Sequence, residues 1–282
     1  MRVFSTVQSM REWSDSCFRA GERIGFVPTM GCLHEGHMSL VRLAREMADV
    51  TVVSIFVNPT QFGPGEDFER YPRVLGSDLS MCEATGVDAV FTPAVSEMYA
   101  EDASTIVEEA AISRGMCGAS RPGHFRGVAT VVAKLFNIVK PAVAVFGRKD
   151  AQQLMVIKRM VRDLNFPVEI VAAPIVRESD GLAMSSRNRY LSADERMVAL
   201  GINRALRWAE ARYANGERSA RSIAAGIGER ISGGGVAVPE YVEVVAAEDM
   251  KPVSELGPGI MIAVAARVGA TRLIDNVVLG VV

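Results

Sequence analysis

The sequence predicts an α/β protein, in which a parallel sheet with helices on both faces precedes a smaller C-terminal α+β domain. Short, almost uninterrupted apolar runs alternate with segments of helical spacing up to about Pro174, and this alternation is typical of parallel strands that are buried on both faces. The 282 residues are 49% hydrophobic and 23% charged, as in a folded globular protein. Because the pattern changes after Pro174, we divide the chain into residues 1–175 and 176–282.

The first domain contains five expected strands, at Ile24–Thr29, Val50–Val57, Ala89–Thr92, Ala142–Phe146 and Val168–Ala172. Apolar residues recur at helical spacing between them, in the segments His37–Ala48, Gly76–Thr85, Val128–Val139 and Ala151–Leu164. Parallel sheets bind their ligands at the carboxyl ends of the strands. The residues of greatest interest are therefore the polar ones that directly follow a strand.

The second domain is expected to begin with two helices, at Ser192–Tyr213 and Ser219–Ile231. Ser192 and Glu195 have the spacing of a capping box at the start of the first helix. A flexible break is expected at Gly233-Gly234-Gly235, and strands follow at Tyr241–Ala246, Ile260–Ala266 and Arg272–Leu279. We expect this smaller domain to close over a site at the edge of the first sheet.

Composition and charge bear on which partners the protein can have. The net charge is −2, and no run of Lys or Arg supports a nucleic-acid partner. The N-terminal segment lacks the apolar core of a secretory signal, and no apolar stretch reaches the ~20 residues of a membrane-spanning helix. The four cysteines form no C-x-x-C pair, which is typical of reduced thiols in the cytoplasm. We expect a cytoplasmic protein with neither a nucleic-acid nor a membrane partner.

The most informative segment is Pro28-Thr29-Met30-Gly31-Cys32-Leu33-His34-Glu35-Gly36-His37. It predicts a strand, a turn containing Gly31, and a helix whose first turn carries His34 and His37 on one face. A helix N-terminus attracts anions through its free N–H groups and its dipole. Two imidazoles at that position add donors for phosphate. The segment therefore predicts a site for nucleotide phosphates.

Other interpretations of this segment are weaker. A pair of surface histidines is the default for His-x-Gly-His taken alone, but it leaves the strand–turn–helix context unexplained. A zinc helix needs H-E-x-x-H, whereas the spacing here is three and only His124 remains as a further histidine. Cys32 is more readily a small packing residue than a nucleophile. Neither a G-x-x-x-x-G-K-[ST] nor a G-x-G-x-x-G phosphate motif occurs in a suitable position.

Four further segments carry polar residues that could serve a site. Asn58 and Gln61 follow the second strand, although Asn-Pro is also an ordinary turn signal. Lys149 follows the fourth strand as a phosphate partner, and Asp150 could bind a ribose hydroxyl, hold Lys149 or cap the next helix. The segment Ser185-Ser186-Arg187 suits a mobile phosphate clamp or a solvated turn. A loop at Arg121–Gly127 adds Arg121 and His124, or is simply a surface loop.

In their order and spacing, these segments resemble the pantothenate synthetase (pantoate–β-alanine ligase) family over residues 24–190. The matching segments are Pro28–His37, Phe56–Phe62, Tyr71–Arg73, Arg121–Phe125, Phe146–Asp150, Met184–Asn188 and, further on, Arg272–Asn276. The wider superfamily consists of nucleotidyltransferases with His-x-Gly-His, including some aminoacyl-tRNA synthetases. Met184-Ser185-Ser186-Arg187 is similar to their second motif, Lys-Met-Ser-Lys-Ser.

The resemblance implies a Rossmann-like fold and a two-step ligation. ATP and D-pantoate would give an enzyme-bound pantoyl adenylate and pyrophosphate. Attack by β-alanine would then give pantothenate and AMP, in the biosynthesis of coenzyme A. The resemblance also implies Mg²⁺ and a homodimer, while the protein ligands of Mg²⁺ and the β-alanine site stay unassigned.

The resemblance also implies roles for individual residues. The catalytic residues would be His34, His37, Lys149, Ser185, Ser186 and Arg187. Pantoate would be bound by Pro28, Met30, Asn58, Gln61 and Gln153. ATP would be bound by Met30, Gly31, His34, His37, Gly147, Lys149, Asp150, Val176, Met184, Ser185, Ser186 and Arg187. Arg121 and His124 are further candidates without an assigned role.

Three positions depart from the family pattern. Cys32 is commonly alanine there, Arg148 is commonly glutamate and Ala151 is commonly tyrosine, and none of the three carries an implied catalytic role. Three other functions share the motif: another small-molecule adenylyltransferase, a relative of the aminoacyl-tRNA synthetases, and a nucleotide-binding regulator without turnover. The near-neutral charge argues against the second of these.

Overall fold

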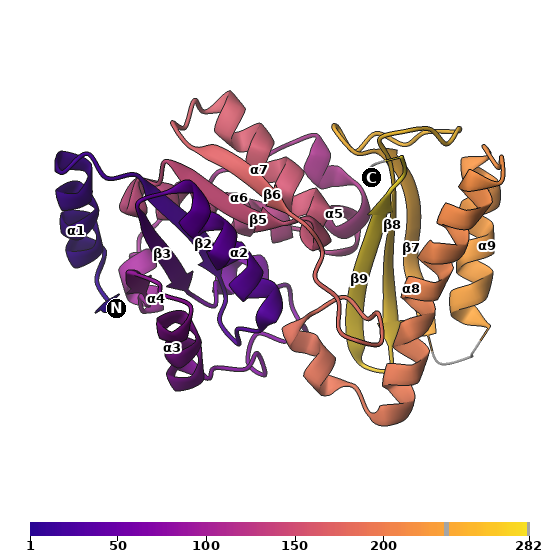
Figure 1. Cartoon of the computed structure of the whole chain (residues 1–282), viewed down its shortest axis with the longest axis horizontal. Helices are drawn as coiled ribbons and strands as arrows, with labels where there is room; N and C mark the ends of the chain where they lie inside the picture. The colour runs from indigo at the N-terminus through magenta and orange to yellow at the C-terminus, as the bar shows by residue number, and fades with distance from the viewer. Residues whose placement is uncertain (234–236, 281–282) are drawn as a thin grey trace.

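The computed structural model describes residues 1–233 and 237–280, and its elements form two sheets with helices around them (Figure 1). In chain order, the first part consists of β1 (Arg2–Phe4), α1 (Val7–Arg19), β2 (Ile24–Thr29), α2 (Glu35–Met47), β3 (Val50–Ile55), α3 (Leu75–Ala84), β4 (Ala89–Phe91), α4 (Val95–Met98), α5 (Met116–Ser120), α6 (His124–Val139), β5 (Val143–Gly147), α7 (Ala151–Asp163) and β6 (Glu169–Ala173). The second part consists of α8 (Ala193–Ala214), α9 (Ala220–Ser232), β7 (Ala237–Ala246), β8 (Ile260–Val268) and β9 (Thr271–Val278).

The strands of the first sheet are all parallel and follow the order β1-β4-β3-β2-β5-β6. From β2 the chain proceeds outward to β3 and β4, and it returns to the other side of β2 to form β5 and β6. The order of the strands therefore reverses between β2 and β5. A crevice forms at the carboxyl ends of the strands at such a point, and ligands bind in it.

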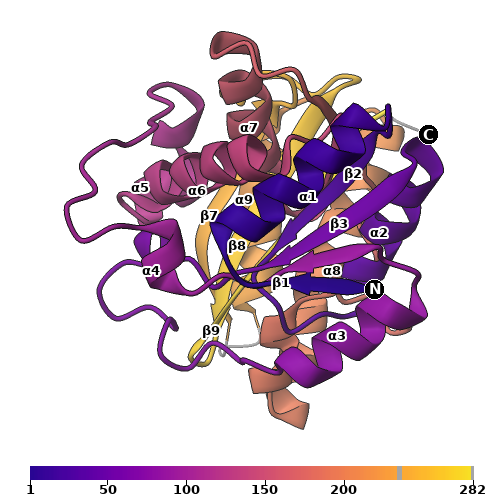
Figure 2. The ribbon, with the colours of Figure 1, turned by 90° about the vertical axis from the view of Figure 1, so that its left-hand side faces the viewer.

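Helices cover both faces of this sheet, as Figure 2 shows for α1 and α6 on one side and α2 and α3 on the other. Neighbouring residues of a strand point to opposite faces. Phe26 accordingly belongs to the core under α1, α6 and α7, whereas Val27 belongs to the core under α2 and α3. The prediction of a parallel sheet buried on both faces is confirmed.

The second sheet is antiparallel, in the order β7-β8-β9, and α8 and α9 cover one of its faces (Figure 1). Its other face adds Val245, Met261 and Ala263 to the core of the first part. Both faces are thus buried, and the packing of this sheet against the first part brings β9 close to the end of β5. The predicted smaller α+β region is confirmed, as is the capping box, in which Ser192 Oγ accepts from the N–H of Glu195 at 3.2 Å.

Several details differ from the prediction. β1, α1, α4 and α5 were not predicted, although Met10 and Cys17 lie on the buried face of α1. The segment expected to be a loop, Arg121–Gly127, includes the first turn of α6. Helix α2 begins at Glu35 rather than His37. Gly234 and Gly235 of the expected break lie outside the described residues.

No helix in the described part of the chain combines the length and the apolar character that crossing a bilayer demands.

Candidate active site

A tight turn joins β2 to α2 and sets the direction of the histidine motif. Gly31 and Cys32 both have left-handed backbones, with φ of 80° and 51°. The buried carboxylate of Asp78, on α3, accepts hydrogen bonds from the N–H groups of Cys32 at 2.9 Å and Leu33 at 2.8 Å. These two charge-assisted bonds hold a backbone that a non-glycine residue rarely adopts. Asp78 was not identified from the sequence, since an aspartate within a helix usually indicates a solvated surface.

His34 and His37 lie together at the start of α2. His34 is the residue that precedes the first turn, and the two ring centroids are 4.1 Å apart. His37 Nδ1 lies 3.3 Å from the backbone N–H of His34 and accepts from it. The proton of a neutral His37 is therefore on Nε2, which leaves Nε2–H as its donor.

Both imidazoles are neutral at pH 7. Burial is the main cause, and it lowers the pKa of His34 to about 4 and that of His37 to about 3. The positive charge of Lys149 lowers both pKa values further. The site thus offers two uncharged N–H donors beside one cationic lysine, at a helix N-terminus that itself attracts anions.

Gly36 lets the His34 ring lie against the helix. A Cβ atom at Gly36 would be 2.9 Å from both Cε1 and Nδ1 of that ring. Helix propensity alone favours alanine over glycine by up to ~1 kcal/mol. We therefore expect Gly36→Ala to keep or raise the melting temperature while it lowers turnover at least about tenfold, because the ring must move.

Thermal melts and steady-state turnover of the same Gly36→Ala preparation test this separation of stability from activity. Gly201→Ala, in α8, is the matched control, because a Cβ there meets no atom within 4 Å. Wild-type turnover of Gly36→Ala would show that the ring position does not depend on this glycine.

A second group of polar side chains lies on the 3₁₀ turn Pro59–Gln61, directly after β3. Asn58 is buried, and its Nδ2 donates to Gln61 Oε1 at 3.0 Å and to the carbonyl of Gly127 at 3.1 Å. Its Oδ1 accepts from the hydroxyl of Tyr99 at 2.9 Å. Asn58 therefore uses its hydrogen-bonding groups within the protein and orients Gln61, whose Nε2 lies 3.1 Å from Met30 Sδ.

The third group follows β5, on the opposite side of the crevice. Lys149 is partly exposed there, and its Nζ lies 4.0 Å from Asp150 Oδ2. Asp150 occupies the N-cap position of α7, as one of its three interpretations predicted, but its side chain makes no capping hydrogen bond there. Asn276, on β9, donates to the carbonyls of Arg148 at 2.9 Å and Lys149 at 3.0 Å. This contact joins the second sheet to the lysine segment, and the sequence alone assigned it no role.

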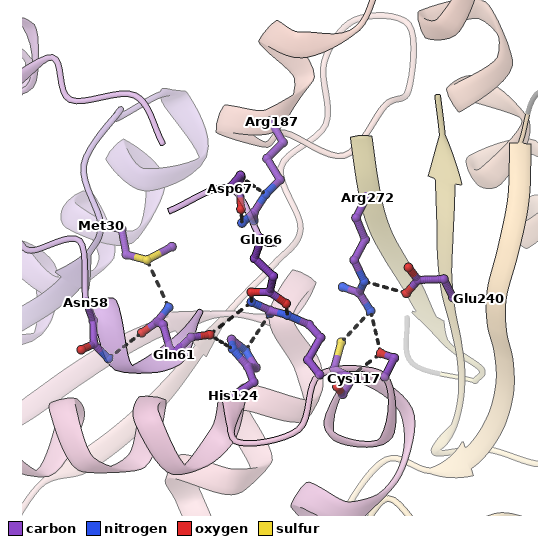
Figure 3. A network of polar contacts seen from close by, with 12 residues as sticks. Met30, Asn58, Gln61, Glu66, Asp67, Cys117, His124, Arg187, Glu240 and Arg272 are labelled. Atoms are coloured by element: carbon purple, nitrogen blue, oxygen red, sulfur yellow. Dashed lines mark hydrogen bonds and ion pairs between the residues drawn. The ribbon is translucent and has the colours of Figure 1, made fainter. Parts of the chain in front are cut away.

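The predicted clamp Ser185–Arg187 enters a 3₁₀ turn at Ser186–Tyr190 rather than an open loop. Ser186 Oγ donates to the carbonyl of Cys32 at 3.4 Å, which places the segment against the turn of the histidine motif. Arg187 forms an ion pair with Asp67, which was not identified from the sequence (Figure 3). The clamp is thus held from two sides.

Two neighbouring cavities open onto these groups. The smaller, of about 220 Å³, we call the histidine cavity. It is lined by the following predicted residues: Pro28, Met30, His34, His37, Asn58, Gln61, Gly147, Lys149, Asp150, Gln153, Val176, Met184, Ser185, Ser186 and Arg187. The larger, of about 440 Å³, we call the outer cavity; it reaches β7–β9 and is lined by Arg121 and His124. Lys149, Asp150, Gln153, Ser185 and Arg187 line both, and Gly31 lines neither.

The structure gives little support to Cys32 as a nucleophile or to the histidine motif as a metal site. Cys32 is buried, and burial raises the pKa of its thiol, which disfavours a nucleophilic thiolate. Within residues 1–233 and 237–280, His, Cys, Asp and Glu form no group of three or more that could hold a metal ion.

The buried histidines should make stability depend on pH. His34, His37 and His124 have pKa values of about 4, 3 and 4, below their usual 6.5. Below pH 6.5 the unfolded chain therefore binds protons that the folded protein does not. We expect full stability above about pH 6.5 and a progressive loss toward pH 4, with each histidine contributing up to ~1.4 kcal/mol per pH unit.

Urea midpoints between pH 4.5 and 7.5 measure this pH dependence. His37→Asn should give a shallower decline than the wild-type chain, because one of the three titrating groups is gone. An unchanged slope would contradict the assignment to the histidines.

The chain is similar to one family of known proteins along its whole length. The model of the family described as "Pantoate-beta-alanine ligase" matches residues 2–278. A pantothenate synthetase of Thermotoga petrophila is 55% identical over 99% of this chain and 100% of its own, and one of Heliobacterium modesticaldum is 53% identical over 100% of both chains.

Solved structures show the same similarity. The pantothenate synthetase of Thermus thermophilus superposes with a TM-score of 0.93, at 46% identity over 98% of this chain and 99% of that one. The pantoate–β-alanine ligase of Francisella tularensis, a complex with "Beta-gamma ATP and Beta-alanine", has a TM-score of 0.82 at 33% identity, over 99% of this chain and 97% of that one.

Proposed function

The chain belongs to the pantoate–β-alanine ligase family, and from that membership we propose how its residues divide the work. The enzyme is an ATP-dependent ligase that forms a C–N bond. It joins pantoate to β-alanine through a pantoyl adenylate and releases pyrophosphate and AMP. A carboxylate is a poor electrophile, and adenylation gives its carbonyl carbon a leaving group.

The phosphates of ATP bind at the start of α2 in this proposal. Charge develops on the oxygens around the α-phosphorus as pantoate attacks, and fixed donors that need no reorganisation stabilise it most. His34 and His37 supply neutral N–H donors, and Lys149 supplies a positive charge. Arg187 and the hydroxyls of Ser185 and Ser186 close the site from the second part of the chain.

Pantoate binds deeper, between the ends of β2 and β3. Gln61 and Gln153 present amides to the histidine cavity, while Pro28 and Met30 supply an apolar wall for the gem-dimethyl carbon. Asn58 acts through Gln61, since its own amide is engaged by the protein. Gly147, Asp150, Val176 and Met184 would then surround the nucleoside, with Asp150 at the ribose.

Four broader features complete the proposal. Mg²⁺ arrives with ATP and is bound mainly by phosphate and water oxygens, which suits a site whose described residues offer no cluster of metal ligands.

The remaining features concern the whole chain. Residues 1–175 and 176–282 act as two domains, the second closing over the first. The chain forms a homodimer, which sedimentation velocity measures. Its four buried, unpaired cysteines suit the reducing cytoplasm.

The single observation that carries this assignment is the histidine cavity. His34, His37, Lys149 and Gln61 come from three segments of the chain and line that one space at the reversal of the strand order.

The release of pyrophosphate and AMP from Mg·ATP tests the assignment, with D-pantoate and β-alanine added singly and together. AMP should form in step with pantothenate only when both substrates are present. Pantoate-independent pyrophosphate release would contradict the substrate assignment. A stable dinucleotide product would identify another kind of adenylyltransferase.

A further inference from the structure

The loop between the 3₁₀ turn Pro59–Gln61 and α3 carries two successive carboxylates, each bound to a different arginine (Figure 3). Glu66 accepts from Nε and Nη2 of Arg121, both at 2.6 Å. Asp67 accepts from Nε and Nη2 of Arg187, both at 2.9 Å. Neither carboxylate belongs to the groups that bind ATP or pantoate in the proposed function.

The Asp67 pair fixes the guanidinium of Arg187 but leaves part of it available. A guanidinium has five N–H donors, and Asp67 engages only the Nε–Nη2 edge. The Cζ atom of Arg187 also lies 5.8 Å from the ring centroid of Tyr71, within the range of a cation–π contact. Because Arg187 lines both cavities, the donors on Nη1 can still reach an anion there.

The Glu66 pair leads by a different path to Gln61. Arg121 Nη1 lies 3.0 Å from His124 Nε2, and His124 Nδ1 lies 2.9 Å from the backbone carbonyl of Gln61. Burial lowers the pKa of His124 to about 4, so this imidazole is neutral at pH 7. Its Nε2 accepts from Arg121, and its Nδ1–H donates to Gln61.

We propose that Glu66 and Asp67 are positioning residues that align opposite ends of the substrate pair. Asp67 orients Arg187 toward the phosphates of ATP. Glu66, through Arg121 and His124, fixes the backbone of Gln61 and hence its amide toward pantoate. This inference rests on the proposed roles of Arg187 and Gln61, and it assigns Arg121 and His124 to the relay.

A pair of isosteric variants separates the two effects. Asp67→Asn should raise KM for ATP about tenfold, since a charged hydrogen-bonded pair is lost, and leave KM for pantoate within about twofold. Glu66→Gln should do the reverse, raising KM for pantoate and not KM for ATP. Asp67→Glu, which keeps the charge, should recover part of the ATP affinity. A general loosening of the fold would instead change both constants together.

Asp180→Asn is the matched control, because Asp180 also accepts from an arginine Nε, that of Arg196, at 2.9 Å. Asp180 lies outside both cavities, and Asp180→Asn should keep the wild-type KM for ATP and KM for pantoate. Pantoate-dependent ATP–pyrophosphate exchange gives the kinetic constants, and thermal melts monitor the fold.

Three results would overturn the inference. A lower KM for ATP in Asp67→Asn would mean that Asp67 competes with phosphate for Arg187. If KM for ATP and KM for pantoate changed equally in each variant, or if both variants had wild-type KM values, the two carboxylates would have no positioning role. Arg187→Ala separates this failure from that of the proposed function. If Arg187→Ala is impaired while Asp67→Asn is normal, only the positioning role of Asp67 is contradicted. Normal kinetics in Arg187→Ala would contradict the role of Arg187 in binding phosphate.

Discussion

His34→Ala and His37→Ala should each slow the formation of pantoyl adenylate by about 10²–10³-fold while the protein stays folded. Each removes one neutral N–H donor that burial and the neighbouring lysine keep uncharged. Such a donor is aimed at the site before the reaction begins, so it stabilises the charge on the α-phosphate without reorganisation. Pantoate-dependent ATP–pyrophosphate exchange measures this step apart from the attack of β-alanine.

The two histidine variants should differ in stability. His37 Nδ1 accepts from the N–H of His34, so His37→Ala also loses a helix-capping bond, at a cost of about 1 kcal/mol. His37→Asn can restore an acceptor near that N–H but not the imidazole donor, and it should therefore recover stability without activity. Wild-type exchange rates in either alanine variant would refute the assignment of the motif.

Gly127→Ala should destabilise the protein by about 1–3 kcal/mol or more and weaken pantoate binding. A Cβ at Gly127 would lie 2.4 Å from the carbonyl oxygen of Thr60 and 2.7 Å from Cα of Gln61. These are backbone atoms, which cannot turn away as a flexible side chain can. The helix and the 3₁₀ turn must therefore separate, and the bond from Asn58 to the Gly127 carbonyl must lengthen.

Urea unfolding and KM for pantoate, measured together, test this prediction. Gly228→Ala in α9 is the matched control, because a Cβ there meets no atom within 4 Å, and helix propensity should make it more stable by roughly 0.5–1 kcal/mol. If the urea midpoint of Gly127→Ala equalled that of the wild-type protein, α6 and the Thr60 backbone could move apart freely. The close approach would then contribute nothing to the free energy of unfolding.

The strands were predictable because burial on both faces leaves a local signature. β2 was predicted with the bounds that the structure has, and the predicted bounds of β3, β4, β5 and β6 differ from the observed ones by one or two residues. β1 was missed because three residues are too short a run to stand out beside α1. Asn58 was correctly singled out as a polar residue after a strand, but only the structure shows that its amide faces Gln61, Gly127 and Tyr99 rather than open space.

The sequence by itself predicted the fold class and the family resemblance, and the residues that it singled out for substrate binding all line the histidine cavity except Gly31. The fold class depends on neighbours along the chain, through apolar runs and turn residues, whereas the roles of most individual site residues were implied by the resemblance to the family. Only the tertiary structure decided what holds those residues in place. Asp78 binds the motif turn across 45 residues, Asp67 holds Arg187 across 120, and Asn276 reaches the carbonyl of Lys149 across 127. The sequence does not show whether a charged or amide side chain forms its hydrogen bonds with water or with a backbone group far along the chain. Its partner can therefore be identified only in the folded structure.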